Sequence, residues 1–272
     1  MSRMIPPHQL NPDISNANTL PMQSIKRMML KVPEVTVYFW IVKLLTTAMG
    51  ESTSDYLVYH INPYIAVMLG GIGLVAALIL QFAVHRYIAW VYWLTALMVA
   101  IFGTMAADVV HIVLGVPYLM STIFFAVVLA IIFAVWYASE KTLSIHSIFT
   151  RRRELFYWAT VMATFALGTA LGDMTASTLK LGYFVSIILF AVLISLPALG
   201  YYLLRLNAIA AFWFAYILTR PLGASIADWI SKPYLGGLGM GDGIVSLVLG
   251  ILIVVFVGYL TISRIDVQGH QR

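Results

Sequence analysis

Four aspartates close copies of one residue pattern, and acidic side chains at a repeated position can bind cations or exchange protons. The pattern is [FY]-W-x9-G-x4-D, an aromatic pair followed by a glycine and an aspartate at fixed spacing. Its aspartates are Asp55, Asp108, Asp173 and Asp228. They are separated by 53, 65 and 55 residues, and four matches at this spacing indicate an internally duplicated unit.

A second position of interest precedes each aspartate by one helical turn. It holds Glu51, Thr104, Thr169 or Ala224, directly after the glycine. Residues four apart share a helix face, so copies one to three present two oxygen-bearing side chains together. Parallel repeats around an axis would bring the acidic groups to the centre, where negative charge is costly unless cations or protons neutralise it. We therefore predict a cation or proton site.

The ligands available for a metal are carboxylate, hydroxyl, amide and imidazole, because the chain has no cysteine. Oxygen-rich sets suit Mg²⁺, Ca²⁺ or Mn²⁺, and an added imidazole favours Mn²⁺ or heavier first-row metals. His111 lies three residues after Asp108, which lets both share one helix face. It is expected either as a ligand or as an ordinary loop histidine. The predicted metal ligands are Asp55, Asp108, Asp173, Asp228, Glu51 and His111.

Two cationic residues fall inside apolar segments. Arg220 precedes Pro221, whose missing amide hydrogen bond frees a backbone carbonyl and bends a helix. We expect Arg220 to neutralise an aspartate, to gate the path or to hold an anionic substrate. Lys43 lies one turn beyond Trp40 and is expected to extend to the cytoplasmic surface.

The remaining residues of the pattern predict helix packing and membrane anchoring. Each glycine precedes a small residue by four positions, a spacing that lets helix backbones approach closely in a bilayer. The tryptophans are expected to anchor at the membrane boundary, with packing at the repeat axis as the alternative. They are Trp40, Trp93, Trp158 and Trp213.

These side chains must be positioned by transmembrane helices, because the chain is 61% hydrophobic and only 10% charged. The predicted fold is an all-α, polytopic membrane protein, and the alternating strands of a transmembrane barrel are missing from the sequence. Eight apolar runs predict helices over 35–57, 64–84, 88–114, 118–139, 155–179, 183–204, 208–230 and 243–262. They form a domain over 34–262, between cytoplasmic tails at 1–33 and 263–272. Residues 1–30 lack the apolar core of a cleaved signal peptide.

The eight helices divide into four parallel two-helix repeats, about 34–86, 87–141, 151–205 and 207–262. A basic-then-acidic lead-in, Lys31 to Glu34 and Arg151 to Glu154, is shared by copies one and three and predicts two pseudo-symmetric halves. A unit of two spans returns to its starting side, so the repeats are related by an axis along the membrane normal. The Gly-rich link 234–243 of the fourth copy is expected to bend back toward the membrane or to line a cavity.

The distribution of basic residues predicts the orientation. Twelve of the sixteen Lys and Arg lie on one side of the eight spans and two on the other, which places both termini in the cytoplasm. The formal net charge of +5 therefore reflects membrane topology, and nucleic acid is not an expected partner.

Several stretches also resemble a known family. YFW, GESTSD, RRRELFYW, LGDMTAS and GASIADW resemble bacterial inner-membrane proteins of uncharacterised function, described as four tandem repeats of two transmembrane segments with a characteristic tryptophan. The likeness covers about residues 34–262. It implies an eight-helix integral membrane fold in the inner membrane and no particular activity.

From the residues, we expect a transporter of a small cation rather than an enzyme. Export of Mn²⁺ or a similar divalent ion, coupled to protons, is the preferred version, with the four aspartates, Glu51, Thr104, Thr169 and Arg220 as binding residues. The expected partners are the lipid bilayer and the small cation or solute, with no bound cofactor; homo-oligomerisation stays open.

Three different functions are also compatible with the sequence. One is proton-coupled transport of a small organic solute, which Arg220 and the aromatic residues would suit. Another is an intramembrane aspartyl peptidase, because Gly239 to Asp242 reads GMGD, with Asp228 as the nearest second aspartate. The third is a non-catalytic membrane scaffold.

Overall fold

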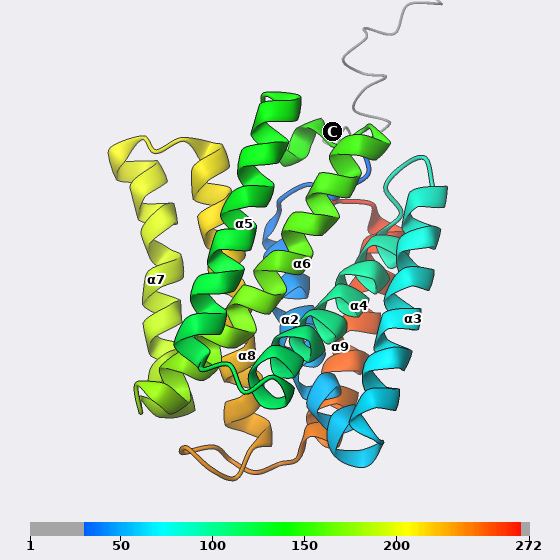
Figure 1. Cartoon of the computed structure of the whole chain (residues 1–272). Helices are drawn as coiled ribbons and strands as arrows, with labels where there is room; N and C mark the ends of the chain where they lie inside the picture. Colours follow the sequence, from blue (N-terminus) through cyan, green and yellow to red (C-terminus); the bar gives the residue numbers. More distant parts are fainter. Residues whose placement is uncertain (1–29, 268–272) are drawn as a thin grey trace, which may run out of the picture.

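The protein is built from eight long helices that run alternately up and down (Figure 1). The computed structural model describes residues 30–267, and no strand occurs among them. The helices are α2 (Val37–His60), α3 (Pro63–Ala83), α4 (Ala89–Asp108), α5 (Tyr118–Glu140), α6 (Arg151–Asp173), α7 (Gly182–Leu204), α8 (Ala208–Ser231) and α9 (Asp242–Ser263).

Seven of these helices, α3 to α9, are long and apolar enough to cross a membrane. The expected all-α, polytopic membrane architecture is thus confirmed, and the predicted runs match the helices to within a few residues. The first helix differs because it carries Lys43, Glu51 and Asp55 along with several threonines and serines. It packs against α4, α8 and α9, so protein rather than lipid surrounds much of its polar surface.

The first helices of the four copies form a closed ring. Helix α2 packs against α4 and α8, and α6 also packs against α4 and α8. We call α2, α4, α6 and α8 the inner ring. The second helices lie outside it, and many of their apolar side chains, such as Ile72, Val127 and Val254, are exposed.

Each outer helix packs mainly against the inner helix of the following copy rather than against its own. Helix α3 packs on α4, α5 on α6, and α7 on α8, while α9 returns to the first copy and packs on α2. The two helices of a sequence repeat are therefore neighbours in the chain but belong to different packing units. This offset links every copy to the next and closes the molecule.

The repeated glycines make the close contacts within the inner ring, as the sequence predicted. A Cβ at Gly50 would overlap Ala100, and one at Gly103 would overlap Phe165. In the next two copies Gly168 faces Arg220, and Gly223 faces Thr47 of the first copy. In every case the contacted residue lies three positions before the glycine of the following copy. The same packing contact thus recurs four times around the ring.

The aromatic pairs form a second cyclic set of contacts near the other end of the ring. The first aromatic residue of each copy contacts the tryptophan of the next, with ring centroids 5.4 to 6.2 Å apart. The four pairs are Phe39 with Trp93, Tyr92 with Trp158, Tyr157 with Trp213, and Phe212 with Trp40.

The expectation that the tryptophans anchor at the membrane boundary is therefore wrong. Trp93, Trp158 and Trp213 are at most 4% exposed, and Trp40 is half-buried. Trp213 donates a hydrogen bond from Nε1 to the Leu143 carbonyl at 2.9 Å. Trp213 also packs against Phe133 and Trp136 of the outer helix α5, so these three tryptophans are buried in contacts between helices.

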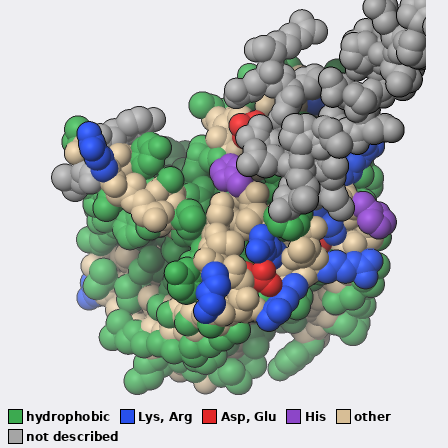
Figure 2. Space-filling view, turned by 90° about the horizontal axis from the view of Figure 1, so that it is seen from above, with side chains coloured by type: hydrophobic (Ala, Val, Ile, Leu, Met, Phe, Trp, Pro, Cys, Tyr) green, Lys and Arg blue, Asp and Glu red, His purple; other side chains and the backbone are tan. Residues whose placement is uncertain are grey.

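Basic residues collect at one end of the molecule, which we call the basic end (Figure 2). It carries the links α3–α4, α5–α6 and α7–α8 and the end of α9 (Figure 1). Exposed cations there are Arg86, Lys141, Arg151, Arg152, Arg205 and Arg264. Lys141, Arg205 and Arg264 each follow the last residue of an outer helix in a left-handed conformation, where positive charge favours the helix dipole.

The segment before α2 packs across the basic end. Leu30 accepts a hydrogen bond from the Tyr87 amide, and Lys31 donates its amide to the Ile148 carbonyl. Residues 30–33, which we assigned to the N-terminal tail, are buried; the tail at 1–29 lies outside the described residues. The packed domain therefore begins no later than residue 30.

A buried ion pair holds this segment in place. Lys31 Nζ lies 2.5 Å from Glu154 Oε2, and Gln81 Nε2 donates to Glu154 Oε1 at 2.8 Å. Lys31 and Glu154 are the basic and acidic residues of the two related lead-ins, so the first and third copies are joined directly.

Candidate functional site

A buried guanidinium lies at the centre of the inner ring. It is carried by α8 and contacts residues of the other three inner helices, α2, α4 and α6. Arg220 of α8 is fully buried, and its Nη2 lies 2.8 Å from Glu51 Oε2 on α2. The same nitrogen donates to the hydroxyls of Thr104 on α4 and of Thr169 on α6, the latter at 2.6 Å. The structure thus brings together four residues that the sequence singled out.

The sequence explains how Arg220 reaches this place. It occupies the position three before the glycine of copy four, where the first three copies have Thr47, Ala100 and Phe165. Gly168 on α6 leaves room for the aliphatic stem, because a Cβ there would overlap the Cβ and Cγ atoms of Arg220. Copy four thus has a long cation where each of the other copies has an uncharged residue. The side chain of Arg220 extends one helical turn along the axis, to the level of Glu51.

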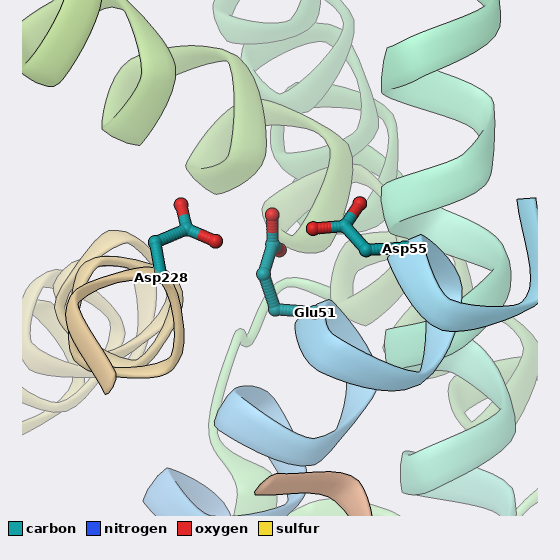
Figure 3. Close-up of side chains that lie close together, drawn as sticks. All are labelled: Glu51, Asp55 and Asp228. Carbon is teal, nitrogen blue, oxygen red and sulfur yellow. The ribbon is translucent and has the colours of Figure 1, made fainter. Parts of the chain in front are cut away.

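Three carboxylates meet one turn further from the basic end, at what we call the acidic end. Glu51 and Asp55 of α2 and Asp228 of α8 offer oxygen atoms that all lie within 4.8 Å of one another. Figure 3 shows the three side chains pointing toward each other from the two helices. Glu51 and Asp228 are at most 5% exposed, and Asp228 Oδ1 has no hydrogen-bond partner. We call these residues the acidic triad.

The two remaining aspartates lie at the same level but outside the triad. Asp108 and Asp173 are half-buried, and each is the last residue before a π-helical turn, Val109–Val113 and Met174–Thr178. Only two of the four repeated aspartates, Asp55 and Asp228, therefore belong to the close carboxylate group.

The π-helical turns occur in copies two and three, whereas α2 and α8 continue as regular helices past their aspartates. The π-helical turns thus group copy two with copy three, whereas the basic-then-acidic lead-ins group copy one with copy three. Insertions of this kind are frequent at functional sites because they redirect side chains. Here they accompany the two aspartates that stay out of the triad.

Lys232 is a site residue that the sequence analysis missed. It is the first residue after α8, and its Nζ bonds to Asp55 Oδ2 and lies 3.6 Å from Asp228 Oδ1. Burial alone would lower the pKa of Lys232, but the carboxylates of Asp228 and Asp55 outweigh it and raise the pKa above its usual value. In the sequence, Lys232 is one of the two basic residues on the side of the spans opposite the other twelve; its spacing of four from Asp228 is the signal that could have identified it.

The Gly-rich link after Lys232 bends back, as predicted, and covers the end of α8. The amides of Leu238, Met240 and Gly241 donate to carbonyls of Trp229, Ile230 and Ser231 at 2.7 to 3.0 Å. These bonds satisfy the free carbonyls at a helix end. Asp242 of the GMGD sequence then begins α9 and is not part of the acidic triad.

His111 is not brought into the triad. It lies in the π-helical turn after Asp108, where its Nδ1 lies 2.6 Å from the Val116 carbonyl oxygen and its ring stacks on Tyr118. These contacts are those of a histidine that holds a loop.

Lys43 does not extend to the cytoplasmic surface, so that expectation is wrong. It is 1% exposed, and its Nζ lies over the rings of Tyr216 at 3.9 Å and Phe165 at 4.5 Å from their centroids. Nζ has no hydrogen-bond partner. Its helix face points into the ring, where aromatic faces rather than water contact the ammonium.

A cavity of about 680 Å³ opens between α2, α7 and α8 near the basic end, and its lining is mostly apolar, including Trp40, Pro197 and Phe212. None of the predicted site residues lines it. The cavity is therefore separate from the polar centre of the ring.

The comparison with known families matches the repeat structure. The family described as Repeat of Unknown Function (DUF347) matches four times, at residues 38–87, 91–142, 156–207 and 211–266. The chain belongs to this family. Each DUF347 repeat contributes one inner and one outer helix, and the four matches confirm the duplicated unit and the resemblance drawn from the sequence. No curated protein and no solved structure gave a match.

The four DUF347 repeats have therefore diverged into different roles at one shared centre. Copies one and four supply the acidic triad, Arg220 and Lys232, whereas copies two and three supply the two threonine hydroxyls. Glu51 pairs with Arg220, and Lys232 is shared between Asp55 and Asp228, so the three carboxylates of the triad face two cations. The triad consists of oxygen ligands only, the set that hard divalent cations prefer.

Proposed function

We propose that this protein is a membrane transporter that moves a small divalent cation, and that the cation binds at the acidic triad. The observation that carries the proposal is the meeting of Glu51, Asp55 and Asp228 at the centre of the ring, with one buried carboxylate oxygen lacking a hydrogen-bond partner. An acidic group buried among membrane helices is costly to keep and is usually functional. A divalent cation would compensate its charge.

In this proposal all eight helices span the membrane, including α2. Its polar residues are tolerated because α4, α8 and α9 surround it. The basic end faces the cytoplasm of a bacterial cell, since cytoplasmic loops carry the excess of Lys and Arg. The triad then lies toward the opposite side, and the aromatic contacts and residues 30–36 close the path toward the cytoplasm.

The triad points to the class of hard cations, namely Mg²⁺, Ca²⁺ and Mn²⁺. The sequence-level preference for Mn²⁺ depended on an imidazole ligand, and His111 is engaged by its own loop. Coupling to protons is part of the proposal, because adjacent carboxylates share protons and release them in steps when a cation binds.

The proposal is tested by divalent-cation flux into proteoliposomes under an imposed pH gradient. The variants are Asp55→Asn and Asp228→Asn, each compared with Asp242→Asn, which removes a nearby carboxylate outside the triad. A charged contact is worth about 1.5–3 kcal/mol, so flux should fall about tenfold or more in the two triad variants. The Asp242 variant should retain it.

Unchanged flux in both triad variants, with all proteins folded by their thermal unfolding curves, would contradict the proposal. The same experiment distinguishes a transporter from a peptidase and from a scaffold. A peptidase built on GMGD would depend on Asp242 and show no cation flux, and a scaffold would show no flux in any form.

Proton-coupled transport of a small anionic or zwitterionic solute is the second candidate. It is favoured by Lys43 Nζ and by Arg220 Nε and Nη1, which are buried donors without hydrogen-bond partners. Donors of this kind bind carboxylates. Under this candidate, flux of a labelled amino or organic acid would depend on Lys43 and Arg220, while divalent cations would not move.

A further inference from the structure

The backbone of Lys232 is held by hydrogen bonds, whereas its long side chain is held only at the ammonium, by Asp55 and Asp228; we call such a residue a tethered cation. Its amide donates to the Asp228 carbonyl at 2.9 Å, and its own carbonyl accepts from the Gly239 amide at 3.0 Å. The Gly-rich link is tied to the last turn of α8 by three more such bonds. The four-carbon stem beyond this anchor can still change rotamer and carry the ammonium out of the triad.

The ammonium satisfies the triad only in part. It forms a hydrogen bond with Asp55, but the 3.6 Å to Asp228 Oδ1 is too long for one. Asp228 Oδ1 is buried and has no hydrogen-bond partner, and the Asp228 side chain points toward Glu51 and Asp55 (Figure 3). One positive charge therefore faces two carboxylates, since Glu51 is matched by Arg220.

We propose that the Lys232 ammonium occupies the cation site at rest and is displaced when a divalent cation binds between Asp55 and Asp228. This inference rests on the proposed function. A divalent ion brings two charges where Lys232 brings one, so exchange completes the neutralisation of both carboxylates. A monovalent ion would replace one charge by one charge and gain nothing electrostatically.

Lys232 accordingly sets both affinity and selectivity. By competing for Asp55 it keeps the divalent cation from binding too tightly to leave, a condition that any conduction site must meet. By being itself monovalent it excludes Na⁺ and K⁺, which cannot displace it at a gain. Its exposed neighbour at the same end, Lys180, contacts none of these carboxylates within salt-bridge distance and provides a matched control.

The test is direct binding of Mn²⁺ to the purified full-length protein, measured by the loss of the free-ion electron paramagnetic resonance signal. Lys232→Met should bind Mn²⁺ about tenfold more tightly than the unaltered protein, and excess Na⁺ should weaken binding in this variant only. Lys232→Arg keeps the charge and should bind like the unaltered protein, as should Lys180→Met.

The outcomes separate the two proposals. If the unaltered protein binds Mn²⁺ and Lys232→Met binds it equally or more weakly while unfolding at a similar temperature, the tethered-cation inference is wrong and the site stands. A second outcome is that neither the unaltered protein nor Lys232→Met binds Mn²⁺, and that Mg²⁺ and Ca²⁺ produce no calorimetric signal either. In that case both the proposed function and the tethered-cation inference are wrong.

Discussion

Arg220 and Glu51 form an ion pair in which each partner is buried and depends on the other. Replacing Glu51 by Gln leaves the guanidinium without a counter-charge, and breaking a buried pair in this way costs about 3–5 kcal/mol. We expect Glu51→Gln to lower the thermal unfolding temperature of the purified protein clearly, as followed by tryptophan fluorescence.

The double variant Glu51→Gln/Arg220→Met is the control for this prediction. It removes both charges and keeps similar side-chain volumes, so it should recover part of the stability lost in Glu51→Gln. An unfolding temperature for Glu51→Gln equal to that of the unaltered protein would show that the pair contributes no stability.

Single residues were predictable where the repeat spacing fixed them. Glu51, Thr104 and Thr169 follow the glycine in their copies, and their convergence on Arg220 follows from that shared position. The positions of the Lys43 and Lys232 side chains could not be predicted from each residue and its own helix alone. A cation near a helix end usually reaches water, and only the ring shows that these two face inward.

At the scale of the helix, Gly168 determines whether α6 and α8 can approach closely enough to place Arg220. A methyl group at this position would overlap the stem of Arg220 and approach Pro221. Overpacking of this kind typically costs about 1–3 kcal/mol. We expect Gly168→Ala to lower the unfolding temperature, and Mn²⁺ binding to weaken with it because the Glu51 pair is displaced.

Gly258→Ala provides the comparison for this prediction, since Gly258 lies in α9 and a Cβ there would meet nothing within 4 Å. Alanine favours a helix over glycine, so this variant should be as stable as the unaltered protein or slightly more so. Equal unfolding temperatures for the two alanine variants would rule out a steric role for Gly168.

The helices themselves were largely predictable, because continuous apolar runs mark them and few structures besides helices cross a bilayer. Two features were not. The π-helical turns after Asp108 and Asp173 leave no hydropathy signal. The burial of Trp93, Trp158 and Trp213 depends on which helix face turns inward, and in a uniformly apolar segment hydrophobicity does not reveal that face.

For the whole molecule, the outer helix of the last copy, α9, returns to α2 of the first copy, and this contact can be tested by cross-linking. Thr53 Oγ1 donates to Ser246 Oγ at 3.2 Å across the two helices. The chain has no native cysteine, so Thr53→Cys/Ser246→Cys should form a single disulfide on mild oxidation. After cleavage at a protease site inserted between α5 and α6, the fragments should stay joined until reduced.

Thr53→Cys/Ser195→Cys is the negative control, because Ser195 is exposed on α7, which packs against α8. A cross-link in this control at the same rate, or none in the Thr53–Ser246 pair, would contradict the packing of α9 on α2.

The number of repeats could be read from the spacing, and the four family matches agree with it. The packing partner of each outer helix could not. A two-residue link joins α2 to α3, yet α3 packs mainly on α4 of the next copy. Short links are compatible with either partner, and the choice is made by side-chain packing between helices distant in the sequence.

We propose that a divalent cation binds where the first and last copies meet, at Glu51, Asp55 and Asp228. The most direct test is an anomalous difference map from crystals of the full-length protein grown with Mn²⁺. We predict one strong peak at bonding distance from the three carboxylates, with the Lys232 ammonium moved away. A map without a peak there, or with Mn²⁺ bound at another place among the helices, would contradict it.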